Sequence, residues 1–197
     1  AAGQEKIAHM AALLGLGQPS GIPLQEEASG LVPNKGYLKK MSPRETWSEA
    51  YTANMAIGQG MLLVTPLQLA SVAAAIGNGG TVFRPRLWDR RVCADQTEIQ
   101  TKPVLVAQLT EAGVSQEGLA VLQAGLWASV NESPGNARRA ATPGFQVAAR
   151  TGTSQIWWQG VQDNITGVMG FADAGDVQYA FSVSVEGAKS GGGVAAP

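Results

Sequence analysis

The chain contains 197 residues, of which 45% are hydrophobic and 15% are charged, and its formal net charge is −1. These values are typical of a globular protein that fills one domain or a large part of one. The charge balance and the lack of a Lys/Arg cluster argue against binding to nucleic acid. The single cysteine, Cys93, excludes an internal disulfide, and the single histidine, His9, argues against a histidine-based triad or a zinc site.

The N-terminal residues predict one helix followed by an irregular connection. Apolar side chains at helical spacing predict a helix over residues 7–14, with His9 on its surface or boundary. The glycines of residues 15–17 end this helix, and residues 18–36 are rich in Gly, Pro and Ser. We therefore expect no regular structure over residues 18–36.

Two later segments carry the sequence pattern of a helix N-terminus. Ser42-Pro43-Arg44-Glu45 offers an N-cap, a first-turn proline and a capping-box partner, which predicts that a helix begins there. Thr65-Pro66-Leu67-Gln68 offers the same pattern, with Gln68 as the partner. The second helix is predicted to run to Ile76 and to end at the Gly-rich residues 77–80.

The middle of the chain is less regular. Residues 81–88 predict a short strand or extended segment, and Pro85 favours a position at a sheet edge. Residues 90–114 show no clear pattern. Ser115 is predicted to cap a helix that ends near Asn131, with leucines on one face.

The last third of the chain predicts three strands. Residues 145–149 begin the first strand, which leads into Arg150-Thr151-Gly152-Thr153. A second strand is expected at about residues 166–172, and a third at residues 177–185, where apolar and polar side chains alternate. Asp173-Ala174-Gly175-Asp176 predicts the hairpin turn between them. Helices first and an antiparallel meander last predict an α+β fold, with helices packed on an antiparallel sheet.

The segment Arg150-Thr151-Gly152-Thr153 has the residue types of an anion site. A guanidinium can hold a carboxylate through two parallel hydrogen bonds. Thr151 and Thr153 would place hydroxyls on one face of the strand, and Gly152 lacks a side chain where a substrate backbone could approach. A strand of this kind can also pair with an extended peptide along its edge. Taken alone, the four residues also fit an ordinary structural strand.

Other segments place this motif in a wider pattern, which resembles the transpeptidase domain of class B penicillin-binding proteins. In chain order they are Gly15-Leu16-Gly17, the Gly- and Pro-containing residues 20–33, Ile57-Gly58-Gln59-Gly60, Thr65–Ala70, Ile76–Gly80 with Arg84-Pro85, Gly170-Phe171-Ala172 and residues 191–197. The version with Gln59 looks most like the elongation-type, penicillin-binding protein 2-like group. Residues 90–115 match only loosely.

The resemblance implies that residues 1–197 are the C-terminal portion of one transpeptidase domain, with a serine β-lactamase/transpeptidase-like fold. The N-terminal part with the nucleophile and the last helix would lie outside the chain. Arg150 and Thr151 would then bind the terminal carboxylate of a peptidoglycan stem peptide or of a β-lactam. Gly152 would keep that approach open, and the backbone N–H of Thr153 would donate to the oxyanion hole. No cofactor and no metal are implied.

Two departures from the family pattern affect this interpretation. Arg150 stands where the family has a lysine, and an arginine keeps the charge but cannot release a proton in a relay. No serine of the chain has a lysine three residues later, so the family's Ser-x-x-Lys nucleophile motif is missing. Ser129-Val130-Asn131 matches the family's Ser-x-Asn motif literally, but it lies on the helix before Arg150, and we interpret it as a coincidence.

The implied activity is D,D-transpeptidation by the full-length protein, with a serine supplied from upstream, so the chain alone is expected to be inactive. Two alternatives remain: a catalytically inactive scaffold or stem-peptide-binding module, and a D,D-carboxypeptidase or β-lactamase. The expected partners are stem peptides, β-lactams and a membrane glycan polymerase. The expected location is the periplasmic face of the bacterial inner membrane, with an N-terminal anchoring helix outside the chain. Residues 156–159, Ile-Trp-Trp-Gln, suggest either a lip of the substrate groove or boundary packing.

Overall fold

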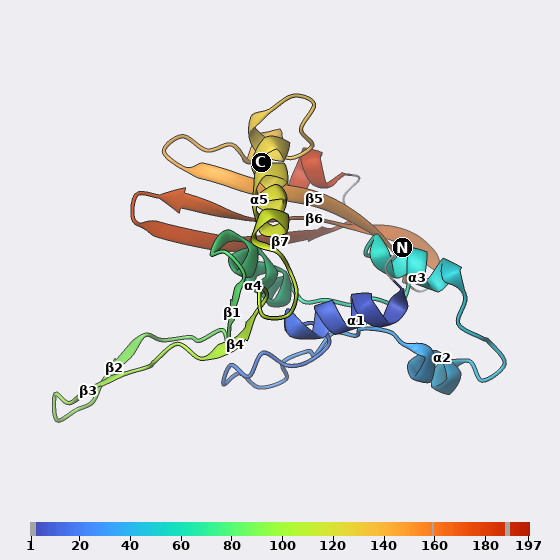
Figure 1. Cartoon of the computed structure of the whole chain (residues 1–197), viewed down its shortest axis with the longest axis horizontal. Helices are drawn as coiled ribbons and strands as arrows, with labels where there is room; N and C mark the ends of the chain where they lie inside the picture. The colour runs from blue at the N-terminus through green and yellow to red at the C-terminus, as the bar shows by residue number, and fades with distance from the viewer. Residues whose placement is uncertain (1–2, 159, 188–189) are drawn as a thin grey trace.

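The computed structural model describes residues 3–158, 160–187 and 190–197. Its centre is a three-stranded antiparallel sheet formed by β5 (Gln146–Trp158), β6 (Val161–Ala174) and β7 (Val177–Glu186), in the order β5-β6-β7 (Figure 1). Among the described strands β5 pairs with β6 alone, so its other edge faces away from the sheet. The motif lies in the middle of β5, where Gly152 pairs with Gly167.

Helices cover both faces of this sheet. Helix α4 (Pro66–Gly77) and helix α5 (Gln116–Asn131) pack against it, and one apolar cluster joins Leu126, Ala148 and Phe171, with Ile76 beside them. The opposite face holds a second cluster, because neighbouring side chains of a strand point to opposite faces. Its members are Val130, Ala137, Val147, Ala149, Val168, Ala172, Ala195 and Ala196. The last two come from or adjoin the short helix η2 (Gly191–Ala195), which contacts β5 and β6.

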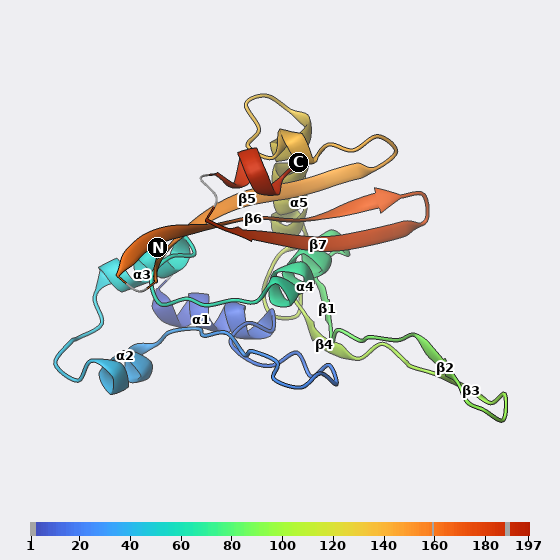
Figure 2. The same ribbon diagram turned by 180° about the vertical axis from the view of Figure 1, so that it is seen from behind.

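The first three helices form a layer beside the sheet (Figures 1 and 2). They are α1 (Gln4–Leu13), α2 (Lys35–Met41) and α3 (Glu49–Ala56). A third apolar cluster joins this layer to the rest of the chain. Its buried members are Ala75, Val82, Leu109 and Leu119, and Met10 and Leu14 pack against them.

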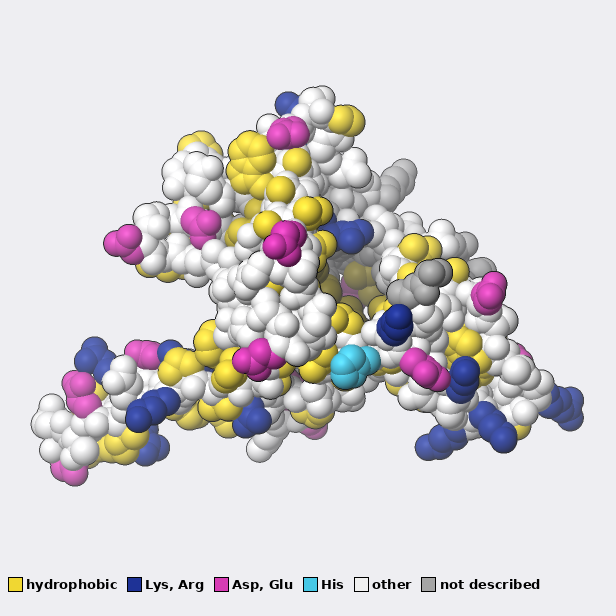
Figure 3. All heavy atoms as spheres, in the orientation of Figure 1, with side chains coloured by type: hydrophobic (Ala, Val, Ile, Leu, Met, Phe, Trp, Pro, Cys, Tyr) yellow, Lys and Arg dark blue, Asp and Glu magenta, His cyan; other side chains and the backbone are white. Residues whose placement is uncertain are grey.

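Two short hairpin ladders extend from the end of α4. Strand β1 (Thr81–Phe83) pairs with β4 (Leu105–Gln108), and β2 (Arg90–Val92) pairs with β3 (Glu98–Gln100). The second ladder forms an arm that projects from the body in both views (Figures 1 and 2). In the space-filling view, Lys and Arg side chains are scattered over this arm and near α2 instead of gathering on one surface (Figure 3).

Several sequence predictions are confirmed. The capping box of Thr65 and Gln68 begins α4, and the Ser115 hydroxyl accepts a hydrogen bond from the Gly118 N–H at the start of α5. The hairpin between β6 and β7 turns at residues 175–176, where Ala174 pairs with Val177. His9 lies exposed on α1. The observed fold is the α+β arrangement expected, with helices packed on an antiparallel sheet.

Other predictions are wrong in their bounds. The helix predicted to begin at Ser42 does not form there: Ser42 is the C-cap of α2, and the next helix begins at Glu49. The irregular connection ends earlier than expected, because the Asn34 side chain accepts a hydrogen bond from the Tyr37 N–H and begins α2. Residues 90–114 contain three short strands, β2, β3 and β4, that their sequence did not indicate.

The sheet also differs from expectation in detail. Strand β5 continues to Trp158 instead of ending at the motif, and β6 is longer than predicted at both ends. The apolar side chains of β7 alternate as expected, but only Phe181 and Val185 pack against the buried cluster, whereas Tyr179 is 52% exposed. The predicted lip at residues 156–159 lies outside the description, because neither the side chains of residues 157 and 158 nor residue 159 is described.

Among the described helices, none is long and apolar enough to cross a bilayer. The described residues also contain no group of three or more His, Cys, Asp and Glu side chains that could hold a metal ion.

Candidate functional site

The four motif residues divide between the two faces of β5. Because side chains alternate along a strand, Arg150 and Gly152 lie on one face, and Thr151 and Thr153 lie on the other. The two threonines therefore share a face, as the sequence predicted. Arg150 is exposed, and none of the ion pairs among the described residues involves it. A single anion can contact both Arg150 and Thr151 only at the outer edge of the strand, where both faces are within reach.

The backbone of β5 has hydrogen-bonding groups on its outer edge. In an antiparallel pair, the N–H and C=O of one residue point to the same side, and the next residue points them to the other side. The Thr153 carbonyl and the Gln155 N–H bond to the Gln59 side chain, at 3.0 Å and 3.3 Å, and therefore point away from β6. It follows that the N–H and C=O groups of Ala149 and Thr151 also point outward.

This outer edge is closed at both ends and open between them. At one end the Asn131 side chain, from the last turn of α5, donates to the Val147 carbonyl at 3.0 Å. At the other end the Gln59 side chain bonds to the Thr153 carbonyl and the Gln155 N–H. The outward groups of Ala149 and Thr151 and the N–H of Thr153 have no hydrogen-bond partner within the described part of the chain. We call these groups the open edge of β5. It extends over about 14 Å, at about 3.4 Å per residue.

Two glycines near the motif, Gly152 and Gly191, have different roles. A Cβ at Gly152 would have no heavy atom within 4 Å, so the fold itself does not require a glycine there. A Cβ at Gly191 would lie 2.7 Å from the Gly152 carbonyl oxygen and 2.8 Å from that of Gly167. Gly191 therefore lets η2 pack closely on the face of the sheet that carries Thr151, which we call the back of the motif. On the opposite face, Gly152 leaves space next to the strand.

The Gln59 loop brings a distant segment of the sequence to the motif. Residues 57–60 follow α3, and the Ser154 hydroxyl donates to the Gly58 carbonyl at 3.3 Å, across 96 positions of sequence. In the space-filling view the surface is hollowed between α5 and the α3 segment, where β5 crosses the molecule (Figures 1 and 3). Sequence reasoning noted Gln59 only as part of a pattern, and it dismissed Asn131 as part of a coincidental motif. The glycines on both sides of Gln59 were the one local signal that the loop has an unusual conformation.

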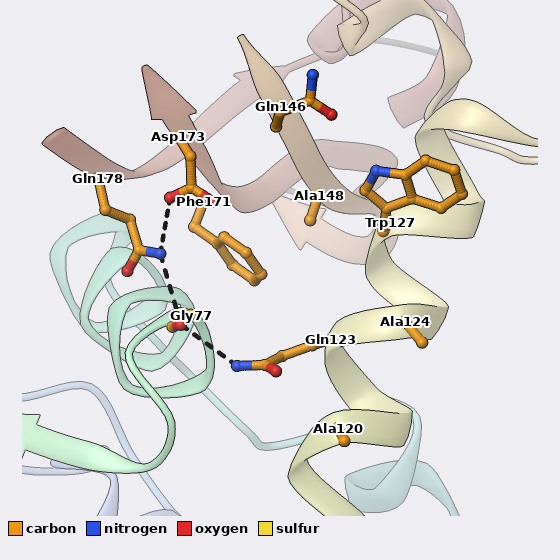
Figure 4. Close-up of a pocket in the computed structure, with 10 residues that line it drawn as sticks. All are labelled: Gly77, Ala120, Gln123, Ala124, Trp127, Gln146, Ala148, Phe171, Asp173 and Gln178. Atoms are coloured by element: carbon orange, nitrogen blue, oxygen red, sulfur yellow. Dashed lines mark hydrogen bonds between the residues drawn. The ribbon is translucent and has the colours of Figure 1, made fainter. Parts of the chain in front are cut away.

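A separate cavity of about 380 Å³ lies further along the sheet, between the end of α4, α5 and the strands (Figure 4). Three of its polar side chains, Gln123, Gln178 and Asp173, already have partners. The Gln123 amide donates to the Ile76 carbonyl at 2.7 Å, and the Gln178 amide donates to the Asp173 carboxylate at 2.8 Å. Because Gln123 donates to carbonyls of the last turn of α4, where helical hydrogen bonds run out, we assign these contacts to packing. None of the motif residues lines this cavity.

Comparisons with known proteins agree with this architecture. The model of the penicillin binding protein transpeptidase domain family matches residues 1–197. The chain is 30% identical over 157 residues to the peptidoglycan D,D-transpeptidase MrdA of Salmonella typhimurium, covering 79% of this chain and 25% of that protein. It is 31% identical over 205 residues to the stage V sporulation protein D of Bacillus subtilis, covering 99% of this chain and 29% of that protein.

Solved structures show the same fold. Penicillin binding protein 3 of Mycobacterium tuberculosis, in complex with ampicillin, superposes with a TM-score of 0.76 at 28% identity, over 94% of this chain and 40% of that one. The chain thus spans about a quarter of the length of the curated relatives it matches. Because the family model matches the whole chain, the chain belongs to the penicillin-binding protein transpeptidase domain family, as its resemblance to the class B members predicted.

Proposed function

We propose that this chain is the C-terminal portion of the transpeptidase domain of a peptidoglycan D,D-transpeptidase of the elongation type. The observation that carries the proposal is the open edge of β5 beside Arg150. Unpaired backbone groups on an edge strand can bind an extended peptide by strand addition, and a guanidinium nearby can hold the carboxylate at the end of that peptide. The name of the Salmonella relative supports the reaction class.

The proposed reaction proceeds in two steps. A serine oxygen from the upstream part of the domain attacks the carbonyl of the penultimate D-alanine, the bond to the terminal D-alanine breaks, and that D-alanine leaves as an amine with the proton from the serine. The amine of a neighbouring stem peptide then attacks the acyl-serine ester. Its proton returns to the serine oxygen, and the new amide bond cross-links the two peptides.

In this reaction the chain supplies binding and charge stabilisation. The free N–H of Thr153 points from the open edge and would donate to the oxygen that becomes negative in the transition state. One donor of this kind lowers the barrier by about 3–4 kcal/mol in comparable enzymes. Arg150 and Thr151 would hold the terminal carboxylate, and the space beside Gly152 would admit the substrate backbone.

Arg150 restricts the mechanism in one respect. A guanidinium stays protonated in proteins, so Arg150 can bind an anion but cannot accept or release a proton during the reaction. Any general base therefore belongs to the upstream part of the domain. We further propose that β-lactams acylate the same serine, and that the protein works at the periplasmic face of the inner membrane, anchored by an N-terminal helix, with a membrane glycan polymerase as partner.

The test uses the full-length protein and a fluorescent penicillin. We expect a covalent adduct that peptide mapping places on a serine upstream of residue 1, and none on residues 1–197. Arg150→Ala should lower the second-order labelling rate by at least about 10-fold, because a charge-assisted hydrogen bond is lost, whereas Arg150→Lys should keep most of it. An adduct within residues 1–197 would show that the nucleophile is assigned wrongly.

A second measurement separates the alternatives. An enzyme that cross-links should transfer the acyl group of a synthetic stem peptide to an added amine, whereas a carboxypeptidase would release only the hydrolysed peptide. A protein that binds the stem peptide without labelling or turnover would be a scaffold, and the proposed reaction would be refuted.

A further inference from the structure

The Gln59 side chain takes up a position on β5 that a bound peptide would need. Gln59 lies in the loop after α3, between Gly58 and Gly60, which both have a φ of 75°. Its own N–H donates to the Asn54 carbonyl at 2.8 Å, which holds the loop backbone to α3. Of Gln59 itself only the side chain reaches across to β5, next to the bond that the Ser154 hydroxyl donates to the Gly58 carbonyl.

The terminal amide of this side chain supplies one donor and one acceptor to β5, as two successive peptide groups of a neighbouring strand would. Its Nε2 donates to the Thr153 carbonyl at 3.0 Å, and its Oε1 accepts from the Gln155 N–H at 3.3 Å. One donor and one acceptor on the same planar group thus satisfy two outward groups of the strand. The Thr153 N–H, on the same residue, remains free.

Strand geometry brings the N–H of a bound substrate to the same outward side of the Thr153 carbonyl as the Gln59 amide. In an antiparallel pair, two hydrogen-bonded residues exchange both of their bonds. A substrate residue whose carbonyl accepts from the Thr153 N–H therefore presents its own N–H to the Thr153 carbonyl. Under the proposed function that residue is the penultimate D-alanine. The Gln59 Nε2 lies 3.0 Å from that carbonyl oxygen, on the outward side from which this N–H would approach.

We infer that Gln59 is an intramolecular competitor for the substrate: its amide holds the Thr153 carbonyl in the free protein and leaves it when the acyl residue pairs with Thr153. This inference rests on the proposed function and adds a residue that tunes substrate binding at the same site.

The two ends of the open edge differ in how easily they can move. Asn131 is part of the last turn of α5 and donates both to the Val147 carbonyl and to the Trp127 carbonyl of its own helix, at 3.0 Å and 2.9 Å. The backbone N–H of Gln59 holds its loop to α3, and the hydrogen bonds between its side chain and β5 are exposed to solvent. Rotation about its side-chain bonds can release the strand without moving the loop. Asn131 is thus a fixed end of the open edge, and Gln59 is a movable one.

The size of the effect follows from one exposed neutral hydrogen bond. Removing the competitor should raise the rate at which a ligand reaches the reacting position by about 2- to 10-fold, the range that one net hydrogen bond represents. The effect should appear in the second-order rate of acylation, because it acts on the free protein.

The experiment compares variants of the full-length protein by their second-order rate of labelling with a fluorescent penicillin. Gln59→Ala removes the whole amide, and Gln59→Met keeps the length of the side chain without its donor and acceptor. Gln18→Ala is the matched control, because it removes an exposed glutamine far from β5 in sequence, whose side chain makes a single hydrogen bond of 3.5 Å, to the Ala12 carbonyl. Melting temperatures verify that all three variants are folded.

We expect Gln59→Ala and Gln59→Met to be labelled about 2- to 10-fold faster than the wild type, and Gln18→Ala to equal it. Labelling of both Gln59 variants at or below the wild-type rate would overturn the inference while leaving the proposed function intact. Acceleration in Gln59→Ala alone would assign the effect to the bulk of the side chain and would also overturn it. If no protein, wild type included, is labelled, the proposed function fails and this inference fails with it.

Discussion

The contact between η2 and the back of the motif offers a sharp test of how the site is held. In Gly191→Ala the new Cβ would lie 2.7 Å from the Gly152 carbonyl oxygen, 2.8 Å from the Gly167 oxygen and 3.2 Å from the Thr151 Cβ. The first two are backbone atoms of residues that pair with each other in β5 and β6, so neither can turn aside as a flexible side chain would. Either η2 or the two strands must move.

Insertion of a methyl group into a tightly packed contact destabilises a protein by about 1–3 kcal/mol. For a domain of this size that corresponds to a decrease in melting temperature of roughly 2–12 °C. The open edge of β5 lies on the displaced strand, and misplacement of a binding group by about 1 Å can cost about 100-fold in rate. A smaller shift of Gly152 should therefore slow penicillin labelling by roughly 10-fold.

The matched control is Gly193→Ala in the same short helix. A Cβ there would meet only the Cβ and Oγ of Ser190, both at 3.7 Å, which is ordinary van der Waals contact. Calorimetry and labelling rates of the two full-length variants should therefore separate clearly. If Gly191→Ala melts and reacts like Gly193→Ala, then η2 does not press on the motif, and our account of the support behind β5 is refuted.

Three further predictions follow from single contacts. Gly152→Ala should leave the melting temperature within about 2 °C of wild type, because the new Cβ meets no atom of the protein. The same variant should be labelled by penicillin more slowly than the wild type, and equal labelling would show that the substrate does not pass this position. Gln68→Leu should lower the free energy of unfolding, measured by calorimetry, by about 2–4 kcal/mol, because the buried amide of Gln68 donates to the Gln18 and Ser29 carbonyls at 3.0 and 2.9 Å. A loss under about 1 kcal/mol would mean that water takes the place of the lost amide. Hydrogen bonds from Ser20, its hydroxyl first, hold the pKa of Glu27 below its ordinary value of 4.5, so the stabilisation is present above that pH and is lost as pH falls through the folded-state pKa. Wild type should accordingly exceed Glu27→Gln in thermal stability at pH 7 and lose this advantage in acid, and a gap that is constant with pH would contradict the assignment.

The features that the sequence determined by itself are those whose causes lie within a few residues. The capping box of Thr65 and Gln68 joins groups three positions apart, so its pattern predicted the start of α4. The two-residue turn before Val177 and the alternation along β7 are local in the same sense. The motif at Arg150–Thr153 was also recognisable, because its residue types and their order after residues 57–80 are properties of the chain alone.

Local patterns were misleading where neighbours competed for the same residues. Ser42-Pro43-Arg44-Glu45 has every residue of a helix start, but α2 already occupies the positions before it, and Ser42 donates its N–H to the Leu38 carbonyl as the end of that helix. The helix that does begin at Asn34 depends on one side-chain hydrogen bond inside a Gly-rich stretch. The sequence pattern alone could not decide whether the helix begins after Asn34 or after Ser42.

The tertiary structure decided which groups of the site are free. That β5 is an edge strand depends on the order of all three strands, and the bond from Gln59 to Thr153 spans 94 positions of sequence. Asn131 reaches the Val147 carbonyl only because α5 crosses that edge. Hydrogen bonds between distant segments depend on how whole elements pack, and no periodicity within either segment encodes that packing. The sequence thus singled out the motif, and packing determined that, among the described residues, the Thr153 N–H is open while its carbonyl accepts from Gln59.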